Sequence, residues 1–469
     1  MAIAAELAAP PWRRVIARAH APVDIASLAA FRIVFGVLMC AGIVRFLATG
    51  WIEPMYGAPH FFFKYPGFEW VTPWSVTGMY VHYAVLAVLA LAIAAGAWTR
   101  IVTPLFTLGF AYTQLCDVTN YLNHHYLVVL LGALLSVLPC DRAWSIDVWR
   151  RPARRLATVP AWVVWLLRLQ VGVVYVFAGL AKAQPDWLVH AQPLNIWLSA
   201  RTDTPWIGGW LDERWVAYAM SWGGFLFDTT IVLWLSWRRT RLAAYAVLLC
   251  FHAAVGYFFN IGMFPFIMVT SALVFFAPSW PRTLLAWGHA RLRWVPRLPA
   301  APSLVEPAPR VAGALLGALL IVHVALQVLL PLRHHVYPGD VLWNEDGMRF
   351  AWQVMVREKH GSVEYVVHFA DGKRLEVPAS EYLTVRQERE MAGQPDLVAQ
   401  LARRIGRDMR GLGRGDVRVT VEARVSLNGR DPVAMIDPSV DLARVHDIGP
   451  RWWVLPAPAG PPIHLRARP

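Results

Sequence analysis

Long apolar segments dominate the pattern of hydrophobic and polar positions along this chain. They are roughly 17–25 residues long, the length that a helix needs to cross the hydrocarbon core of a bilayer. The segments are 25–48, 80–98, 101–116, 123–140, 161–181, 214–236, 241–259, 261–278 and 310–332. Two pairs almost run together, at 98–101 and 259–261, and each break is either a turn or an interruption within one span. The pattern predicts a polytopic α-helical membrane bundle of about nine spans.

The pattern changes after residue 332. The stretch "SVEYVVHFADGKRLEVP" alternates apolar and polar positions around Asp371-Gly372, which predicts a hairpin. Residues 396–409 have the spacing of an amphipathic helix, and "DVRVTVEARVSLNGRDPVAMI" alternates again around Asn428-Gly429. We therefore predict an N-terminal segment (1–24), a helical transmembrane domain (25–332), a small α+β domain (333–456) and a tail (457–469).

Charge gives this bundle a direction. The chain is 57% hydrophobic with a net charge of +13, and its arginines gather in short connections between apolar segments. That distribution is a membrane-topology signal and argues against nucleic acid as a partner. With a cytoplasmic N-terminus, the arginine-rich connections 99–100, 141–160, 237–241 and 279–309 are inside, the last one as a linker. The α+β domain is then extracytoplasmic. The four cysteines have no metal-ligand spacing, so no metal is expected.

Lys182 is the first candidate for chemistry because it ends the apolar segment 161–181. A charge beside hydrocarbon is costly and is usually functional. Burial disfavours the ammonium form, which makes Lys182 a candidate general base. The more common alternative is a lysine at a helix end that only reaches for the membrane interface. Asp186 follows as a partner of Lys182 or as a helix cap, and Trp187 as an aromatic anchor at the interface.

Other ionisable residues also fall in or beside apolar segments. His124 follows Asn123 at the start of one segment, and His252 lies within another. Histidine can act as an acid, a base or a hydrogen-bond donor near neutral pH. Each histidine also has a purely structural explanation: His124 could belong to a helix cap, and His252 could be a hydrogen-bonded residue of the core. Arg32 and Asp228 are two further charges in apolar segments, and an ion pair between them would explain both. Several such groups in one bundle nevertheless favour a site.

These residues lie in stretches that resemble the vitamin K-dependent gamma-carboxylase family, whose membrane part is the HTTM domain. The likeness includes unusual polar positions and extends over nearly the whole chain. The similar stretches are "FRIVFGVLM" (31–39), "DVTNYLNHHYLVVLLGALLSVLPCDRAWSID" (117–147), "YVFAGLAKAQPDW" (175–187), "GGFLFD" (223–228), "FHAAVGYFFNIGMFPFIMVTSALVFFAPSWPR" (251–282), "WQVMV" (352–356) and "SLNGRDPVAMIDPSVDL" (426–442).

The resemblance implies an enzyme that oxygenates reduced vitamin K with O2 to its epoxide and adds CO2 to glutamate side chains. It implies that Lys182 is the catalytic base and that His124 and His252 are functional. The animal enzymes have two consecutive lysines here, of which the second is catalytic; this chain has Ala181 at the first position and Lys182 at the second. The residues expected to bind substrate or quinone are Asn123, Tyr126, Asp186, Trp187, Asp228 and Asn260.

The resemblance also implies partners and a location. The Ala- and Arg-rich composition suggests a bacterium, in which menaquinol would serve as the hydroquinone and the bilayer would be the inner membrane. An exported glutamate-containing peptide is the expected substrate. The chain lacks the long distal region that the animal enzymes have after "PRWWVLP", which leaves the peptide open. Two alternatives are a quinol oxygenase without peptide carboxylation and a non-catalytic quinone-binding membrane protein.

Overall fold

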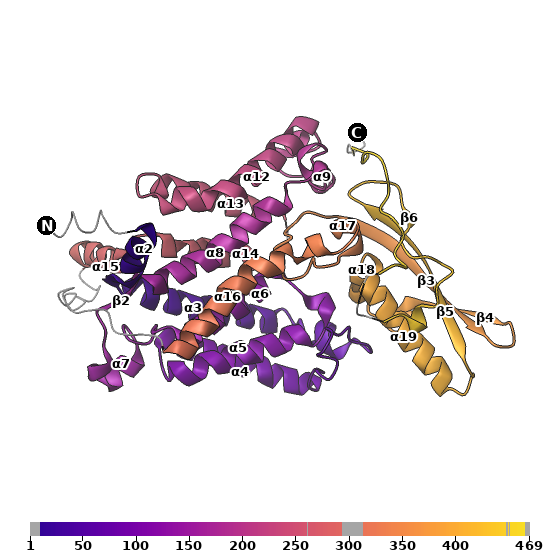
Figure 1. The fold of residues 1–469 in the computed structure, drawn as a ribbon, viewed down its shortest axis with the longest axis horizontal. Helices are drawn as coiled ribbons and strands as arrows, with labels where there is room; N and C mark the ends of the chain where they lie inside the picture. Colours follow the sequence, from indigo (N-terminus) through magenta and orange to yellow (C-terminus); the bar gives the residue numbers. More distant parts are fainter. Residues whose placement is uncertain (1–9, 260, 293–312, 447–448, 450, 465–469) are drawn as a thin grey trace.

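Helices fill the N-terminal part of the computed structural model, and a four-stranded sheet lies at one end (Figure 1). The structure describes residues 10–259, 261–292, 313–446, 449 and 451–464. The helices of the N-terminal part are α2 (Pro11–His20), α3 (Ala26–Ala48), α4 (Val76–Ala95), α5 (Thr99–Leu115), α6 (Asn123–Val137), α7 (Ile146–Arg150), α8 (Ala161–Ala181), α9 (Pro185–Leu188), α10 (Leu194–Ser199), α11 (Gly208–Leu211), α12 (Arg214–Ser236), α13 (Arg241–Phe258), α14 (Phe264–Ser271), α15 (Trp280–Arg291) and α16 (Ala314–Leu332). Strands β1 (Pro22–Asp24) and β2 (Thr158–Pro160) pair near the N-terminus.

The helices support a membrane bundle, but the count of about nine spans is not confirmed. Within the described ranges, six helices are long and apolar enough to cross a bilayer: α3, α4, α8, α12, α13 and α16. The bent pair Phe264–Phe275 and Trp280–Arg291, with an angle of 97°, would make a seventh span. Helices α5 and α6 have only 17 and 15 residues. At about 1.5 Å per residue they are shorter than a hydrocarbon core of about 30 Å.

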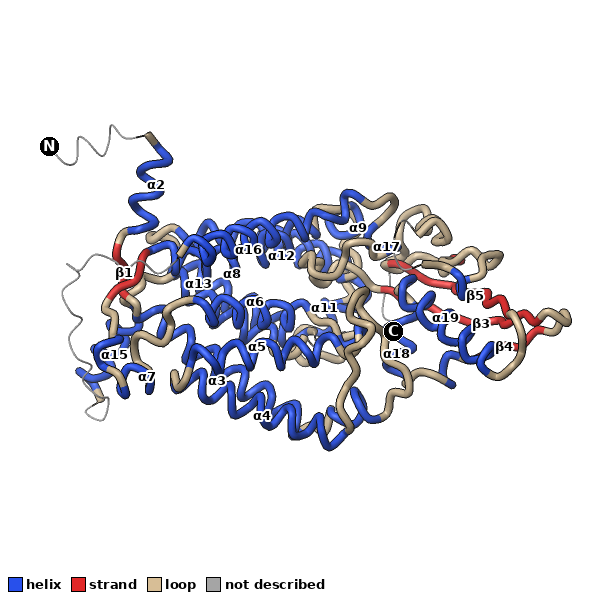
Figure 2. The backbone as a smooth tube through the Cα atoms, turned by 60° about the horizontal axis from the view of Figure 1, so that its bottom comes forward, coloured by secondary structure: helices blue, strands red, loops and turns tan. Residues whose placement is uncertain are grey.

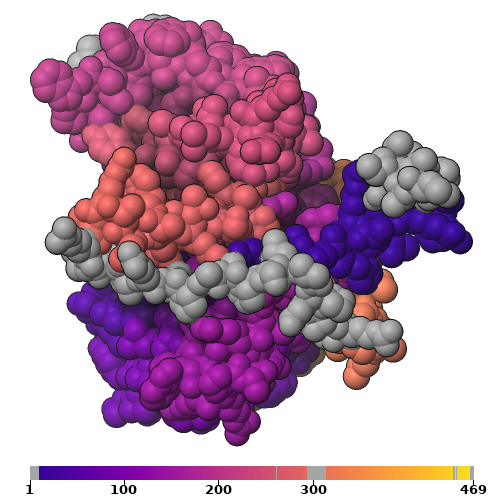
Figure 3. All heavy atoms as spheres, turned by 90° about the vertical axis from the view of Figure 1, so that its left-hand side faces the viewer, coloured from indigo at the N-terminus to yellow at the C-terminus, as the bar shows by residue number. Residues whose placement is uncertain are grey.

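Two details of the predicted spans are settled by local contacts. The break near 98–101 is a turn, because Gly96 ends α4 in the left-handed region and the Asp147 carboxylate accepts hydrogen bonds from the backbone N–H groups of Trp98 and Thr99. The predicted linker 279–309 begins with helix α15. Helices α2, α7 and α15 and the turn between α12 and α13 lie at the end of the bundle away from the sheet (Figure 1). At this end α15 lies between α7 and the α12–α13 pair (Figure 3).

Close helix packing inside the bundle depends on small residues. A Cβ on Gly36 of α3 would lie 2.5 Å from the backbone N of Ala94 in α4, and a Cβ on Gly179 of α8 would lie 2.6 Å from Thr229 Cγ2 in α12. The fully buried Arg32 donates hydrogen bonds to main-chain carbonyls, including that of Cys140. The ion pair considered between Arg32 and Asp228 is therefore not formed.

The C-terminal part is a small α+β domain, as the alternating pattern predicts. Its antiparallel sheet has the order β4-β3-β5-β6 and carries helices on one side (Figure 2). The bounds are α17 (Val341–Asn344), β3 (Lys359–Phe369), β4 (Arg374–Val377), α18 (Val385–Ala392), α19 (Pro395–Gly411), β5 (Val417–Leu427) and β6 (Val433–Ala434). Both predicted turns are confirmed, with Gly372 and Gly429 at φ of +82° and +84°.

One hydrophobic core joins this domain to the loops of the bundle. It combines residues of the sheet and α19 with residues of the segments that connect the long bundle helices, including Phe63, Val118 and Trp187 of α9. Polar contacts cross the same boundary. Gln387 of α18 donates to the Asp117 carboxylate at 2.8 Å, and Arg386 donates to the backbone carbonyl of Thr119 at 3.1 Å. The domain is thus fixed against one end of the bundle.

Candidate functional site

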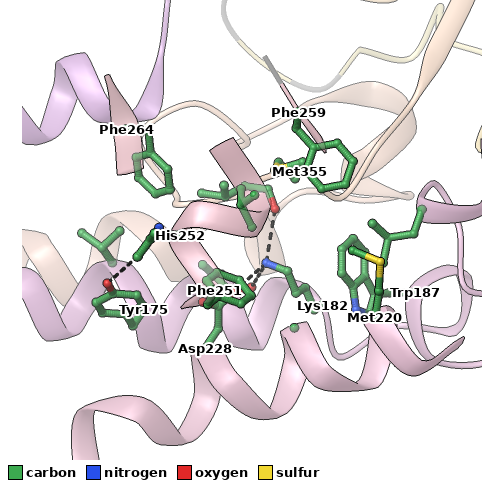
Figure 4. A pocket seen from close by; sticks show the side chains of 16 residues that line it. Tyr175, Lys182, Trp187, Met220, Asp228, Phe251, His252, Phe259, Phe264 and Met355 are labelled. Carbon is green, nitrogen blue, oxygen red and sulfur yellow. Dashed lines mark hydrogen bonds and ion pairs between the residues drawn. The ribbon is translucent and has the colours of Figure 1, made fainter. Parts of the chain in front are cut away.

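Lys182 lies inside the protein at the C-terminal end of α8, where the chain leaves the helix. Its Nζ donates to the Asp228 carboxylate of α12 at 2.9 Å and to the backbone carbonyls of Ala178 at 3.1 Å and Val354 at 3.4 Å (Figure 4). Nζ also lies over the Trp187 ring, 5.1 Å from its centroid. Because both side chains of the pair are buried, Lys182 does not reach for the membrane interface.

Lys182 lines a small cavity of about 70 Å³, and His252, Asp228 and Trp187 form part of the same wall. His252 Nε2 lies 2.8 Å from the hydroxyl of Tyr175 on α8. Its Nδ1 is buried and has no hydrogen-bond partner among the described residues. A buried ring nitrogen without a partner is costly, so His252 has an unused polar atom beside the cavity.

His124 lies in a second and much larger cavity of about 710 Å³ between α3, α6 and the segment before α14. Phe264, Val354 and Met355 line both cavities and form the boundary between them. The site residues therefore divide into two groups. Lys182 and His252 share the small cavity, whereas Asn123 and His124 share the large one.

Arg45 of α3 faces the same large cavity as His124. The position that a Cβ of Gly262 would occupy is 3.9 Å from Arg45 Nη2 and 4.0 Å from His124 Nε2. The Arg45 guanidinium packs over the Trp51 ring at 5.0 Å, and no ion pair joins it to a carboxylate within the described residues. A cation and an imidazole thus border one cavity, which suits an anionic ligand.

A third cavity of about 230 Å³ continues from the large one toward the α+β domain. The two share Asn123, Met355 and Glu390 on their walls. Most of the wall of the third cavity is polar, with Arg349 and Arg357 among its residues. A polar route therefore leads from the surroundings of His124 to the boundary between the two domains.

The expected roles of Asp186 are both wrong. Its carboxylate accepts hydrogen bonds from Arg430 at 2.5 and 2.8 Å and from Asn428 at 2.8 Å, and it neither pairs with Lys182 nor caps α9. Burial alone would raise the pKa of Asp186, but these hydrogen bonds and the Arg430 charge hold the pKa below its usual value. Asp186 thus ties the chain beside Lys182 to the α+β domain. Trp187 is buried in the site and is not an interface anchor.

The remaining predicted residues have different surroundings. Asn123 Oδ1 accepts a hydrogen bond from the Tyr121 hydroxyl at 2.9 Å. Tyr126 packs on the Trp352 ring at a centroid distance of 5.0 Å and is not part of either cavity wall. Asn260 lies outside the described residues.

Sequence reasoning missed the contribution of residues 350–356. Phe350, Trp352 and Met355 have φ values of +63°, +57° and +56°, which non-glycine residues rarely adopt. Such conformations gather at functional sites because packing must hold them in place. Here this segment supplies the Val354 carbonyl to Lys182 and the Met355 side chain to all three cavity walls. The family-like stretch "WQVMV" was the available signal.

Comparison with known protein families gives two matches that together cover most of the chain. Residues 20–280 match the HTTM domain, and residues 313–460 match the lumenal domain of the vitamin K-dependent gamma-carboxylase. No solved structure matches the chain. The small cavity around Lys182 is lined by residues of both matched ranges. The chain is therefore a member of the vitamin K-dependent gamma-carboxylase family.

Proposed function

We propose that this protein is a gamma-glutamyl carboxylase that couples epoxidation of a reduced quinol by O2 to carboxylation of glutamate residues in exported peptides. Oxygenation of the hydroquinone to its epoxide, with release of water, supplies the base that removes a glutamyl Cγ proton, and the resulting carbanion adds CO2. The observation that carries the proposal is the buried Lys182–Asp228 pair, with its 2.9 Å contact, beside a cavity at the junction of both family domains.

Lys182 acts in this proposal as the base that accepts a proton from a quinol hydroxyl. The wall of this cavity is mostly apolar, which limits the water around Nζ and favours direct proton transfer between bound groups. Asp228 lies within hydrogen-bond distance and stabilises the ammonium group that forms. His252, held by Tyr175, and His124 supply hydrogen bonds to oxygen atoms of the bound substrates.

The cavities fit substrates of this kind. A volume of about 710 Å³ with many apolar side chains on its wall can accept most of a quinol, in the usual range of about 300–1,000 Å³ for small-molecule sites. For its hydroxyl to reach Lys182, the quinol ring would have to pass the shared boundary of Phe264, Val354 and Met355 into the small cavity. Its apolar wall includes Met39, Phe46 and Ile267. Arg45 and His124 provide the polar part, where a glutamyl carboxylate would be attracted.

Orientation follows from the arginine-rich connections at the end of the bundle opposite the sheet. We propose that this end is cytoplasmic, in the inner membrane of a bacterium, under the positive-inside rule. Residues 25–332 then form the membrane domain, and residues 333–456 form an extracytoplasmic domain. An exported peptide reaches the site from that side, and menaquinol reaches it from the bilayer.

The experiment uses purified protein in nanodiscs with menaquinol or vitamin K hydroquinone, O2, labelled bicarbonate and a glutamyl peptide. Label uptake and epoxide are measured for wild type, Lys182→Ala and the matched control Lys373→Ala, whose lysine is on the surface. We expect both products from wild type and from the control, and neither product from Lys182→Ala.

Other results would reject parts of this proposal. Epoxide without label in wild type would favour a quinol oxygenase that does not carboxylate this peptide. Quinol binding without either product would favour a non-catalytic quinone-binding protein. Full activity of Lys182→Ala would exclude Lys182 as the base.

A further inference from the structure

A basic groove lies on the surface between helix α19 and the loop of residues 60–72. It has a volume of about 580 Å³ and is separate from the three cavities of the site. Its cationic wall is formed by Lys64, Arg403, Arg404, Arg407 and Arg410. Arg403, Arg407 and Arg410 recur at intervals of four and three residues and therefore share one side of α19, and Arg404 lies beside them.

Few negative charges offset these cations. Among the described residues that form the wall, Glu69 has the single carboxylate, and this carboxylate accepts a hydrogen bond from the Gly67 backbone N–H at 2.9 Å. Arg404 pairs with Asp408, but both side chains are partly exposed to solvent, so the pair is weak. The groove therefore has a strongly positive potential.

Arg403 has a role within the domain, since it donates to the Val445 backbone carbonyl at 3.0 Å, but the packing of α19 on the sheet does not use the other three arginines. Helix α19 packs on the sheet through the opposite side of the helix, which carries Leu397, Val398, Leu401 and Ile405. The exposed Arg407 makes no contact that would hold the helix in place. Arg404, Arg407 and Arg410 thus add positive charge that the packing of α19 does not use, which suggests that the groove binds an anionic partner.

The groove and the large cavity have no wall residue in common, but a series of hydrogen bonds connects them. Gln400 of α19 exchanges two hydrogen bonds of 2.9 Å with the Lys64 backbone, and Lys64 Nζ donates to the Cys116 carbonyl at 3.0 Å. The chain then continues through residues 119–125, which line the cavity that contains His124. A molecule in the groove is thus one segment away from the site.

We propose that this groove docks a glutamate-rich stretch of the peptide substrate while another of its glutamates occupies the site. The inference rests on the proposed function, which requires a substrate rich in carboxylates. From Arg403 to Arg410 the helix rises by about 10 Å, which about three residues of an extended peptide would cover. Side chains of such a peptide can place carboxylates at more than one arginine.

The test measures binding without catalysis. A fluorescent peptide with several glutamates is titrated with the full-length protein in phosphatidylcholine nanodiscs, and anisotropy reports its Kd. The double variant R404E/R407E should weaken binding by about tenfold, because each reversal removes an attraction and adds a repulsion. R374E/R424E changes the net charge equally on exposed positions of β4 and β5 and should leave the Kd unchanged.

Two further measurements sharpen the result. The neutralised variant R404Q/R407Q should show a smaller loss, and added salt should weaken binding to wild type more than to R404E/R407E. The Kd of R404E/R407E for a blocked tripeptide with one glutamate should equal that of wild type, because such a peptide cannot occupy groove and site together.

Equal affinity of wild type and R404E/R407E would overturn the inference, and so would equal binding of a peptide with glutamine in place of glutamate. The groove would instead bind lipid headgroups if R404E/R407E differed from wild type only in nanodiscs that contain phosphatidylglycerol and its affinity for the peptide were unchanged. That result would also overturn the inference. Measuring carboxylation and peptide binding separately distinguishes the failure of this inference from the failure of the proposed function. If wild type fails to carboxylate but the groove still binds the acidic peptide, only the proposed function fails.

Discussion

The contact between Asp186 and Arg430 allows a quantitative test of how the two domains hold the site together. The residues are far apart in sequence, and their side chains are 10% and 13% exposed. Two hydrogen bonds of 2.5 and 2.8 Å join them, and Asn428 adds a third to the same carboxylate. Arg430→Ala would leave a buried carboxylate with one donor. Breaking a buried pair costs about 3 kcal/mol at the low end of measured values.

Such a loss would raise the opening equilibrium of the β5–β6 turn by about two powers of ten, since each 1.4 kcal/mol is tenfold. The backbone N–H groups of Asn428 and Arg430 report this opening because they donate to the carbonyls of Glu358 and Leu427. Hydrogen exchange measures the opening free energy of wild type, Asp186→Asn, Arg430→Ala and the double variant. The double-mutant cycle should give a coupling of about 2 kcal/mol or more.

The exposed pair Arg404–Asp408 serves as the matched control, with an expected coupling of about 0.3–0.5 kcal/mol. An equally small coupling for Asp186–Arg430 would refute the reasoning, because it would mean that the pair is solvated. The pH dependence has a definite sign. Because the pKa of Asp186 is lowered in the folded chain, its contribution is present above the ordinary value of about 3.9 and is lost as the pH falls through the lowered value.

Two more predictions concern the stability of the two domains. Gly179→Ala should destabilise the bundle by about 1–3 kcal/mol in thermal unfolding, because the new Cβ would lie 2.8 Å from the Thr229 backbone N. The control Gly223→Ala should have almost no effect, because a Cβ at that position would meet open space. Burial lowers the pKa of Lys359 to about 8. The unfolded chain then holds this proton more tightly than the folded chain. The free energy of unfolding of wild type should therefore rise by about 2 kcal/mol relative to that of Lys359→Met between pH 8 and 10. If the unfolding free energies of the two proteins changed equally with pH, this pKa assignment would be contradicted.

Local patterns in the sequence were enough for the secondary structure around the site. The segments 161–181 and 214–236 coincide with α8 and α12, because a membrane-length apolar run ends where polar residues begin. The turns at Gly372 and Gly429 followed from residue types that tolerate positive φ. The span count was less secure. Helices α5 and α6 are short, and the apolar residues of α6 do not distinguish a short helix packed inside a bundle from a full span.

The sequence by itself determined which residues carry charge among apolar neighbours and therefore singled out Lys182, His124, His252 and Asp228. Only the tertiary structure decided their partners. Lys182 pairs with Asp228 of another helix, Asp186 turns away to Arg430, and the histidines are separated into two cavities. The physical reason is that helices and turns arise from contacts between near neighbours in the chain. Ion pairs and cavities arise from segments that meet only after packing, and no local periodicity records which segments meet.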